Sequence, residues 1–93
     1  MIKSFNHKGL KLFFLTGKTS GIIPEHAKAL QLRLADLHTA TDVNDLANIP
    51  GYRLHRLKGD RQDIWSITVR ANWRITFRFE NGNAEIVNYE DYH

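Results

Sequence analysis

The sequence contains no cysteine, and this absence excludes several kinds of chemistry at once. Disulfide bonds, thiolate catalysis and cysteine-ligated zinc are ruled out, and a reducing cytoplasm is the expected location. No apolar run approaches the roughly 20 residues that a transmembrane helix needs, so no membrane association is expected. The first residues also lack the apolar stretch of a signal peptide, which argues against export.

Acidic residues are scarce over most of the chain. The net charge is +3, but all 13 Lys and Arg residues lie in positions 1–79, together with only six of the ten acids. The other four acids are Glu80, Glu85, Glu90 and Asp91. A basic body of this kind attracts polyanions and speeds their encounter. The acidic tail opposes that attraction locally, and solubility is its simplest explanation.

The first half of the chain has the spacing of a short strand followed by helices. The 93 residues, 42% of them hydrophobic, are expected to form one globular domain over 1–93. Residues 2–5 alternate and predict a first strand. Apolar residues at helical spacing predict a short helix over 7–15 and a longer one over 24–38, and a further helical turn is expected to end at Leu46.

The second half changes to the two-residue alternation of β-strands. The predicted strands are 52–57, 65–70, 73–80 and 84–89, and a tight turn at Asn81-Gly82 precedes the last of them. The resulting prediction is an α+β fold in the order β-α-α-β-β-β-β. A small antiparallel sheet carries the helices on one face, with tryptophans, phenylalanines and helical leucines in the core.

The sheet face that points away from the helices is predicted to be polar and basic. Its expected residues are Ser66, Thr68, Arg70, Arg74, Thr76 and Arg78. A solvated strand face without a function shows the same pattern. The basic stretch 53–61 is expected to extend this face, which favours an RNA-binding surface.

Two histidines among cations suit the cleavage of RNA. A base removes the 2′-hydroxyl proton, the oxygen attacks the adjacent phosphorus, and an acid protonates the departing 5′-oxygen. Histidine serves both steps because its reference pKa of about 6.5 is close to cellular pH. The candidate proton carriers are His55 and His93, the last residue of the sequence. No metal or other cofactor is required where cations stabilise the phosphate charge.

Four cations are candidates for that stabilisation and for binding RNA. Lys58 and Arg74 are candidates for stabilising the phosphorane, and Arg61 or Arg53 for holding backbone phosphates. The segment Lys58-Gly59-Asp60 also fits a charged turn without a function.

The end of the chain supplies further candidates. Asp91 would orient a histidine or act as the base, and Tyr92 offers a ring that stacks on a nucleobase. The tail 91–93 also fits an unpaired chain end. Zinc is disfavoured because only Asp91 and His93 show a short ligand spacing. The other histidines, His7, His26 and His38, are expected on helix surfaces without a task.

Three motifs carry a resemblance to a known family. Residues 54–61 read LHRLKGDR, residues 65–77 read WSITVRANWRITF, and residues 88–93 read NYEDYH, with weaker matches at 1–5 and 17–19. Together they resemble the HigB toxins, which belong to the RelE/ParE superfamily of bacterial toxin–antitoxin systems. The resemblance spans nearly the whole chain, and the central and terminal motifs are its specific part.

This resemblance implies a ribosome-dependent mRNA endonuclease that cuts the codon in the decoding site of the 70S ribosome. It also implies a HigA-type helix-turn-helix antitoxin as partner, with operator DNA contacted only through that antitoxin. The residues matching the catalytic positions are His55, Asp91, Tyr92 and His93, with Lys58 in the matching basic turn and Arg74 at a position where a phosphate-stabilising role is plausible. One departure is Arg56, where relatives can carry proline.

Two alternatives remain open at this point. A non-catalytic toxin that inhibits gyrase, like the ParE branch, needs no proton carriers and leaves His55, Lys58 and the terminal residues unexplained. A decayed relative that only binds its antitoxin would be harmless when expressed alone.

Overall fold

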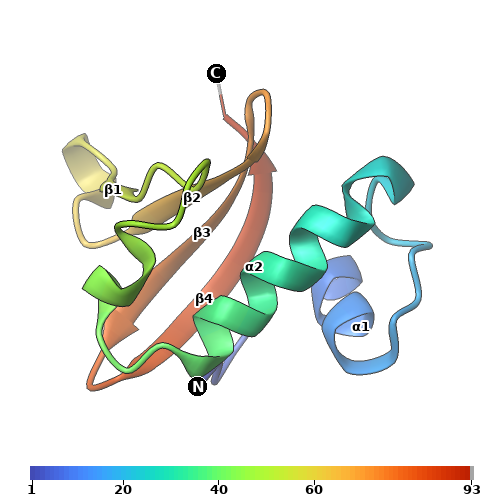
Figure 1. Cartoon of the computed structure of the whole chain (residues 1–93), viewed down its shortest axis with the longest axis horizontal. Helices are drawn as coiled ribbons and strands as arrows, with labels where there is room; N and C mark the ends of the chain where they lie inside the picture. The colour runs from blue at the N-terminus through green and yellow to red at the C-terminus, as the bar shows by residue number, and fades with distance from the viewer. Residues whose placement is uncertain (93) are drawn as a thin grey trace.

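The computed structural model describes residues 1–92 and contains two α-helices packed against a four-stranded antiparallel sheet (Figure 1). The helices are α1 (Lys8–Thr16) and α2 (Ala27–Thr39), and the short 3₁₀ turns are η1 (Pro24–His26), η2 (Val43–Leu46) and η3 (Gly59–Arg61). The strands are β1 (His55–Arg56), β2 (Trp65–Arg70), β3 (Trp73–Glu80) and β4 (Asn83–Asp91), in the spatial order β1-β2-β3-β4. The predicted α+β class is confirmed. No helix within residues 1–92 is long and apolar enough to cross a membrane.

Two of the predicted strands are shorter than expected. Residues 2–5 make only two isolated parallel bridges to β4, Ile2 to Ala84 and Phe5 to Val87. Between these bridges Ile86 has a positive φ of 49°, so an irregularity in β4 interrupts the ladder. The predicted strand 52–57 is reduced to His55–Arg56 because the backbone of Arg53 turns to a φ of 50°.

Local interactions define both ends of α1. At its start, the Nδ1 of His7 accepts a hydrogen bond from the backbone N–H of Leu10 at 2.9 Å. At its end, Gly17 has a φ of 80°, and its N–H donates to the carbonyl of Phe13. Gly9 allows α1 to approach the loop before η1, since a Cβ there would lie 2.2 Å from the carbonyl oxygen of Gly21.

The core lies between α2 and the helix-facing side of the sheet. The fully buried side chains include Phe77, Ile67 and Ile75 from the sheet and Leu30, Leu34 and Leu37 from α2. Each buried side chain of this size contributes about 1.5–3 kcal/mol through removal of apolar area from water. The predicted core is confirmed for Phe77 and for the helical leucines Leu10, Leu30, Leu34 and Leu37. It is wrong for the exposed leucines Leu12, Leu15 and Leu32, and the two tryptophans and the other phenylalanines are only partly buried.

The prediction that three histidines lie idle on helix surfaces is wrong. His26 is 6% exposed, and its Nδ1 lies 2.6 Å from the hydroxyl of Tyr89. Burial lowers the pKa of His26. This residue lies in η1, before the periodic part of α2 begins, and there it points toward the sheet. His7 caps α1, and the Nδ1 of His38 accepts from the N–H of Ile2 at 3.1 Å.

Candidate active site

Polar side chains form two rows across the sheet face that points away from the helices. The first row follows the pairing His55–Ser66–Thr76–Asn88, and the second follows Thr68–Arg74–Glu90. Side chains alternate between faces along a strand, so the members of both rows lie on one face. This face is called the polar face below. The sequence-based grouping of Ser66, Thr68, Arg74 and Thr76 agrees with this register.

The centre of the polar face is buried, whereas both a solvated strand face and an RNA-binding surface would leave it exposed. Ser66 is 0% exposed and Thr76 is 2% exposed. The segment between β1 and β2 explains this burial, because Leu57 and Ile64 are buried outside the main core cluster. From the same segment the guanidinium of Arg61 reaches β4. The segment therefore covers part of the polar face.

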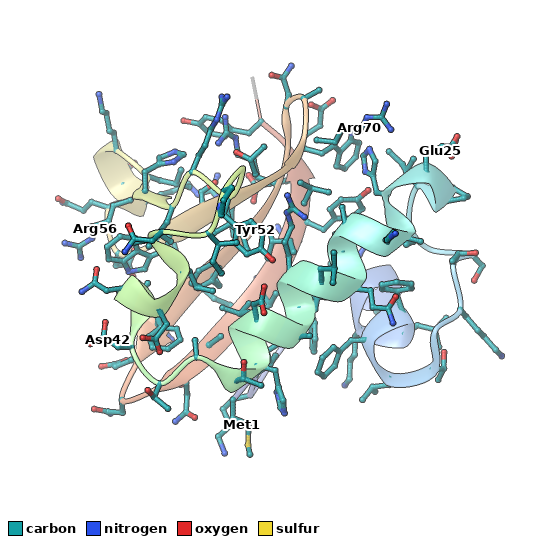
Figure 2. All side chains as sticks on the ribbon, in the orientation of Figure 1. Met1, Glu25, Asp42, Tyr52, Arg56 and Arg70 are labelled. Atoms are coloured by element: carbon teal, nitrogen blue, oxygen red, sulfur yellow. The ribbon has the colours of Figure 1, made fainter. Side chains whose placement is uncertain are left out.

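The expected position of Arg70 on the polar face is wrong. The β2–β3 register shifts between Thr68 and Arg70, which breaks the alternation at this point. Arg70 instead lies near the buried ring of His26, where its charge further lowers the pKa of that histidine. Figure 2 shows Arg70 at the same end of the molecule as Glu25.

Glu90 organises the middle of the polar face, a role that sequence reasoning missed. Its two carboxylate oxygens accept one hydrogen bond each from Arg61, both at 2.9 Å. The hydroxyl of Thr76 donates to it at 2.9 Å and the amide of Asn88 at 3.3 Å. The hydrogen bonds from Arg61 lower the pKa of Glu90, and those from Thr76 and Asn88 act in the same direction. From the sequence, Glu90 is expected only as one of four acids near the end of the chain and as part of the motif 88–93.

Arg74 and Tyr92 lie together at the end of the sheet where β4 finishes. The guanidinium carbon of Arg74 is 5.2 Å from the ring centroid of Tyr92, a cation–π contact. The Nη1 of Arg74 donates to the hydroxyl of Thr68 at 3.4 Å. The Nε of Arg74 is buried and makes no hydrogen bond within residues 1–92. The Tyr92 N–H donates to the carbonyl of Asn72 at 2.8 Å, which extends the pairing beyond β4.

His55 is exposed on β1, and one hydrogen bond defines its proton position. Its Nδ1 lies 2.9 Å from the carbonyl oxygen of Arg53. A carbonyl oxygen only accepts, so Nδ1 carries the proton in this contact. The lone pair of Nε2 then remains available to accept a proton, which is the property that a general base needs.

The other predicted site residues occupy different places. Lys58 is exposed at the start of η3, and Arg53 is exposed in the preceding turn. Asp91 is the last residue of β4 and pairs with Trp73, so strand alternation directs it to the side opposite Tyr92. His93 lies outside the described residues.

The candidate catalytic residues on the polar face are spread across the sheet and do not contact one another as a single cluster. His55 lies on β1 and Tyr92 follows β4, so they lie at opposite edges of the sheet, separated by about 14 Å across it at ~4.8 Å per strand, and Tyr92 is also displaced along β4 from Asn88, which is in register with His55. Arg74 and Arg61 lie between them. Within residues 1–92 there is no group of three or more side chains placed to hold a metal. His55 and Asp91 lie on opposite edge strands of the sheet.

The architecture is shared with a protein of known structure. The crystal structure of a YafQ mutant from E. coli matches with a TM-score of 0.61 over 98% of this chain and 91% of that chain. The two sequences are 16% identical, so this likeness shows the fold alone. The shared fold is therefore a small α+β domain, and in this chain its polar face carries basic and hydrogen-bonding groups.

Sequence comparison identifies the family. Residues 3–93 match the family described as the RelE-like toxin of type II toxin–antitoxin system HigB. A relative from Proteus vulgaris, named Endoribonuclease HigB, is 59% identical over 93 residues and covers 100% of both chains. The chain belongs to the HigB-like toxin family, and as a type II toxin it has an antitoxin as its partner.

Proposed function

We propose that the protein cuts mRNA in the decoding site of a translating 70S ribosome and so inhibits translation in the cytoplasm. The protein is an endoribonuclease of the HigB-like toxin family, like its 59%-identical relative. The observation that carries the finer proposal is the contact between the Nδ1 of exposed His55 and the carbonyl oxygen of Arg53. In this contact Nδ1 donates the hydrogen bond, and the Nε2 lone pair of His55 is available beside a basic, polar sheet face.

The proposed reaction uses the RNA's own 2′-hydroxyl as nucleophile. A base takes the hydroxyl proton, the 2′-oxygen bonds to phosphorus, and the bond to the 5′-oxygen breaks as an acid gives that oxygen a proton. The products are a 2′,3′-cyclic phosphate and a 5′-hydroxyl. No step passes through a metal, because guanidinium and ammonium groups stabilise the negative charge on phosphorus.

Each group has a proposed role in this reaction. His55 and His93 carry protons, and Asp91 orients a histidine or acts as the base from the side of β4 opposite Tyr92. Arg74 and Lys58 stabilise the charge on the phosphorane, and Tyr92 stacks on a base of the codon. The phosphate-binding candidates are Arg53, which is exposed, and Arg61, whose guanidinium also binds Glu90.

The runner-up, inhibition of gyrase without catalysis, lacks a specific supporting observation. A gyrase inhibitor needs no proton carrier, so this function does not explain the hydrogen bond between the Nδ1 of His55 and the carbonyl of Arg53. The Arg74–Tyr92 stack likewise suits a single-stranded nucleic acid, in which an unpaired base is available for stacking.

Mapping of cellular 5′ ends tests the proposal. Brief induction should create new 5′-hydroxyl ends inside reading frames, in step with the codon register, and blocking translation should prevent them. The His93→Ala variant should create none. Cuts without codon register would contradict ribosome dependence, and a DNA-damage response without mRNA cuts would favour gyrase inhibition.

The groove between α1 and α2 suits the antitoxin, which we propose is a HigA-type protein. The groove has a volume of about 850 Å³ and is lined mainly by apolar side chains, including Phe13, Phe14, Leu15, Ala27, Leu34 and Ala35. Lys28 lines it as well, and the same helix–loop region carries Lys8, Lys11 and Lys18. This charge pattern fits an acidic amphipathic segment. An antitoxin bound there leaves the polar face uncovered and acts by blocking entry to the ribosome.

Leu15→Glu should weaken antitoxin binding by at least about tenfold, because Leu15 lines the groove and is 65% exposed, so the fold tolerates the change. Titration with purified antitoxin measures the affinity. The matched control is Leu32→Glu, since Leu32 is a 55% exposed leucine of α2 that does not line the groove. Wild-type affinity for Leu15→Glu would place the antitoxin elsewhere.

A further inference from the structure

The strand that carries His55 is too short to hold that histidine by pairing alone. β1 contains two residues, and its register consists of His55 with Ser66 and Arg56 with Trp65. A pair this short at a sheet edge frays readily, since each residue fixed costs about 1–2 kcal/mol of backbone entropy. The placement of His55 therefore needs another anchor.

Tyr52, three residues before His55, is that anchor. It is 4% exposed, and its hydroxyl donates to the carboxylate of Asp36 on α2 at 2.5 Å. The guanidinium carbon of Arg33, also on α2, lies 4.5 Å from the centre of its ring. Burial, with help from Asp36, raises the pKa of Tyr52 to about 12, so the hydroxyl keeps its proton and remains a donor. Figure 2 shows Tyr52 between α2 and the strands.

Backbone bonds tie the same residue to the sheet. The carbonyl of Tyr52 accepts from the N–H of Thr68 on β2 at 2.7 Å. The Nε of Arg33 donates to the carbonyl of Thr68 at 2.6 Å, so α2, Tyr52 and β2 form one connected unit. Tyr52 is thus held on its ring, its hydroxyl and its backbone.

The connection from Tyr52 to His55 passes through a strained turn. Arg53 has a φ of 50°, a conformation that a non-glycine residue adopts only when its surroundings impose it. The carbonyl of Arg53 accepts the hydrogen bond from the Nδ1 of His55. The orientation of that carbonyl follows from the position of Tyr52, to which Arg53 is directly bonded. The Tyr52 anchor thereby determines which nitrogen of His55 keeps its proton.

We propose that Tyr52, held by Asp36 and Arg33, is a positioning residue that keeps His55 in the tautomer and direction needed for proton transfer. This inference rests on the proposed catalytic role of His55. Tyr52 itself lies under the surface and does not touch substrate. Tyr52 should therefore affect the rate of the chemical step, and the affinity for RNA should not depend on it.

The test compares Tyr52→Phe and Asp36→Asn with the wild type in single-turnover cleavage of mRNA on programmed ribosomes. Both variants should lower the rate at saturating toxin by about tenfold, in line with the cost of a misplaced catalytic group, and leave the half-saturating concentration unchanged. Imidazole ¹⁵N spectra should show His55 shifting from the Nδ1–H toward the Nε2–H tautomer. Ser4→Ala is the control for stability, because it removes one hydrogen bond to Ile86 at the opposite edge of the sheet.

A second background separates this inference from the proposed function. In a His55→Ala background, Tyr52→Phe should cause no further loss, since a residue that acts through His55 has nothing left to position. A further loss there, or a wild-type rate and tautomer for Tyr52→Phe, would overturn the positioning role. Full activity of His55→Ala would overturn the catalytic assignment of His55, whereas the ¹⁵N spectra would still report whether Tyr52 positions the ring.

Discussion

Replacing His55 with alanine should reduce mRNA cleavage by at least about a hundredfold and leave the domain folded. The loss follows because the Nε2 lone pair of His55 is the proposed proton carrier on β1. The fold should persist because His55 is exposed, so truncation removes no buried packing. Single-turnover cleavage on programmed ribosomes measures the rate, and thermal unfolding measures stability.

Two further variants make this result interpretable. His93→Ala should cause a loss of similar size, because the reaction needs both an acid and a base. His38→Ala is the matched control, since His38 accepts a hydrogen bond from Ile2 on the helical side and has no proposed part in the reaction. That control should lose about 1 kcal/mol of stability and keep its cleavage rate. A folded His55→Ala protein that cuts at the wild-type rate would remove His55 from the mechanism.

Much of the fold could be predicted because local signals agreed with the final packing. Asn81 and Gly82 have φ values of 53° and 78°, as a two-residue hairpin requires, and this turn was predicted from the dipeptide. The alternation over 65–70 and 73–80 likewise predicted β2 and β3 with their bounds. The predicted lengths of the strands over 2–5 and 52–57 were wrong because backbone irregularities shorten them. These irregularities are the positive φ values of Ile86 and Arg53, and side-chain patterns do not reveal them.

The candidate site was only partly predictable, for a related reason. Alternation placed Arg74, Thr76 and Ser66 on one face, because that rule needs only the strand pairing. It could not predict that Arg61 would bind Glu90, since the pair joins a loop to a strand 29 positions away. Alternation also could not predict on which face of the sheet Arg70 lies, because the β2–β3 register shifts between Thr68 and Arg70.

Among the cations of the polar face, Arg74 has the largest expected effect on the cleavage rate, because it lies at the end of the sheet next to Tyr92. Arg74→Ala should lower single-turnover cleavage by about 10²–10³-fold, the usual cost of losing a preorganised donor to developing charge. Its guanidinium lies against the Tyr92 ring, and its only side-chain hydrogen bond within residues 1–92 runs from Nη1 to Thr68 at 3.4 Å, so no carboxylate neutralises its charge there. Arg74→Lys should restore only part of the rate, because an ammonium keeps the charge but loses the planar stack and the paired donors.

Arg78 is the matched control for this prediction. It lies on the same strand, and its Nε, like that of Arg74, is buried without a hydrogen bond within residues 1–92, but its Nη2 forms an ion pair with Glu85 at 3.1 Å. Arg78→Ala should therefore leave the cleavage rate unchanged. If Arg74→Ala and Arg78→Ala lowered the rate equally, the effect would be one of general positive charge. A loss confined to Arg74, partly restored by lysine, would instead indicate a directed interaction with the phosphate at the Tyr92 end of the polar face.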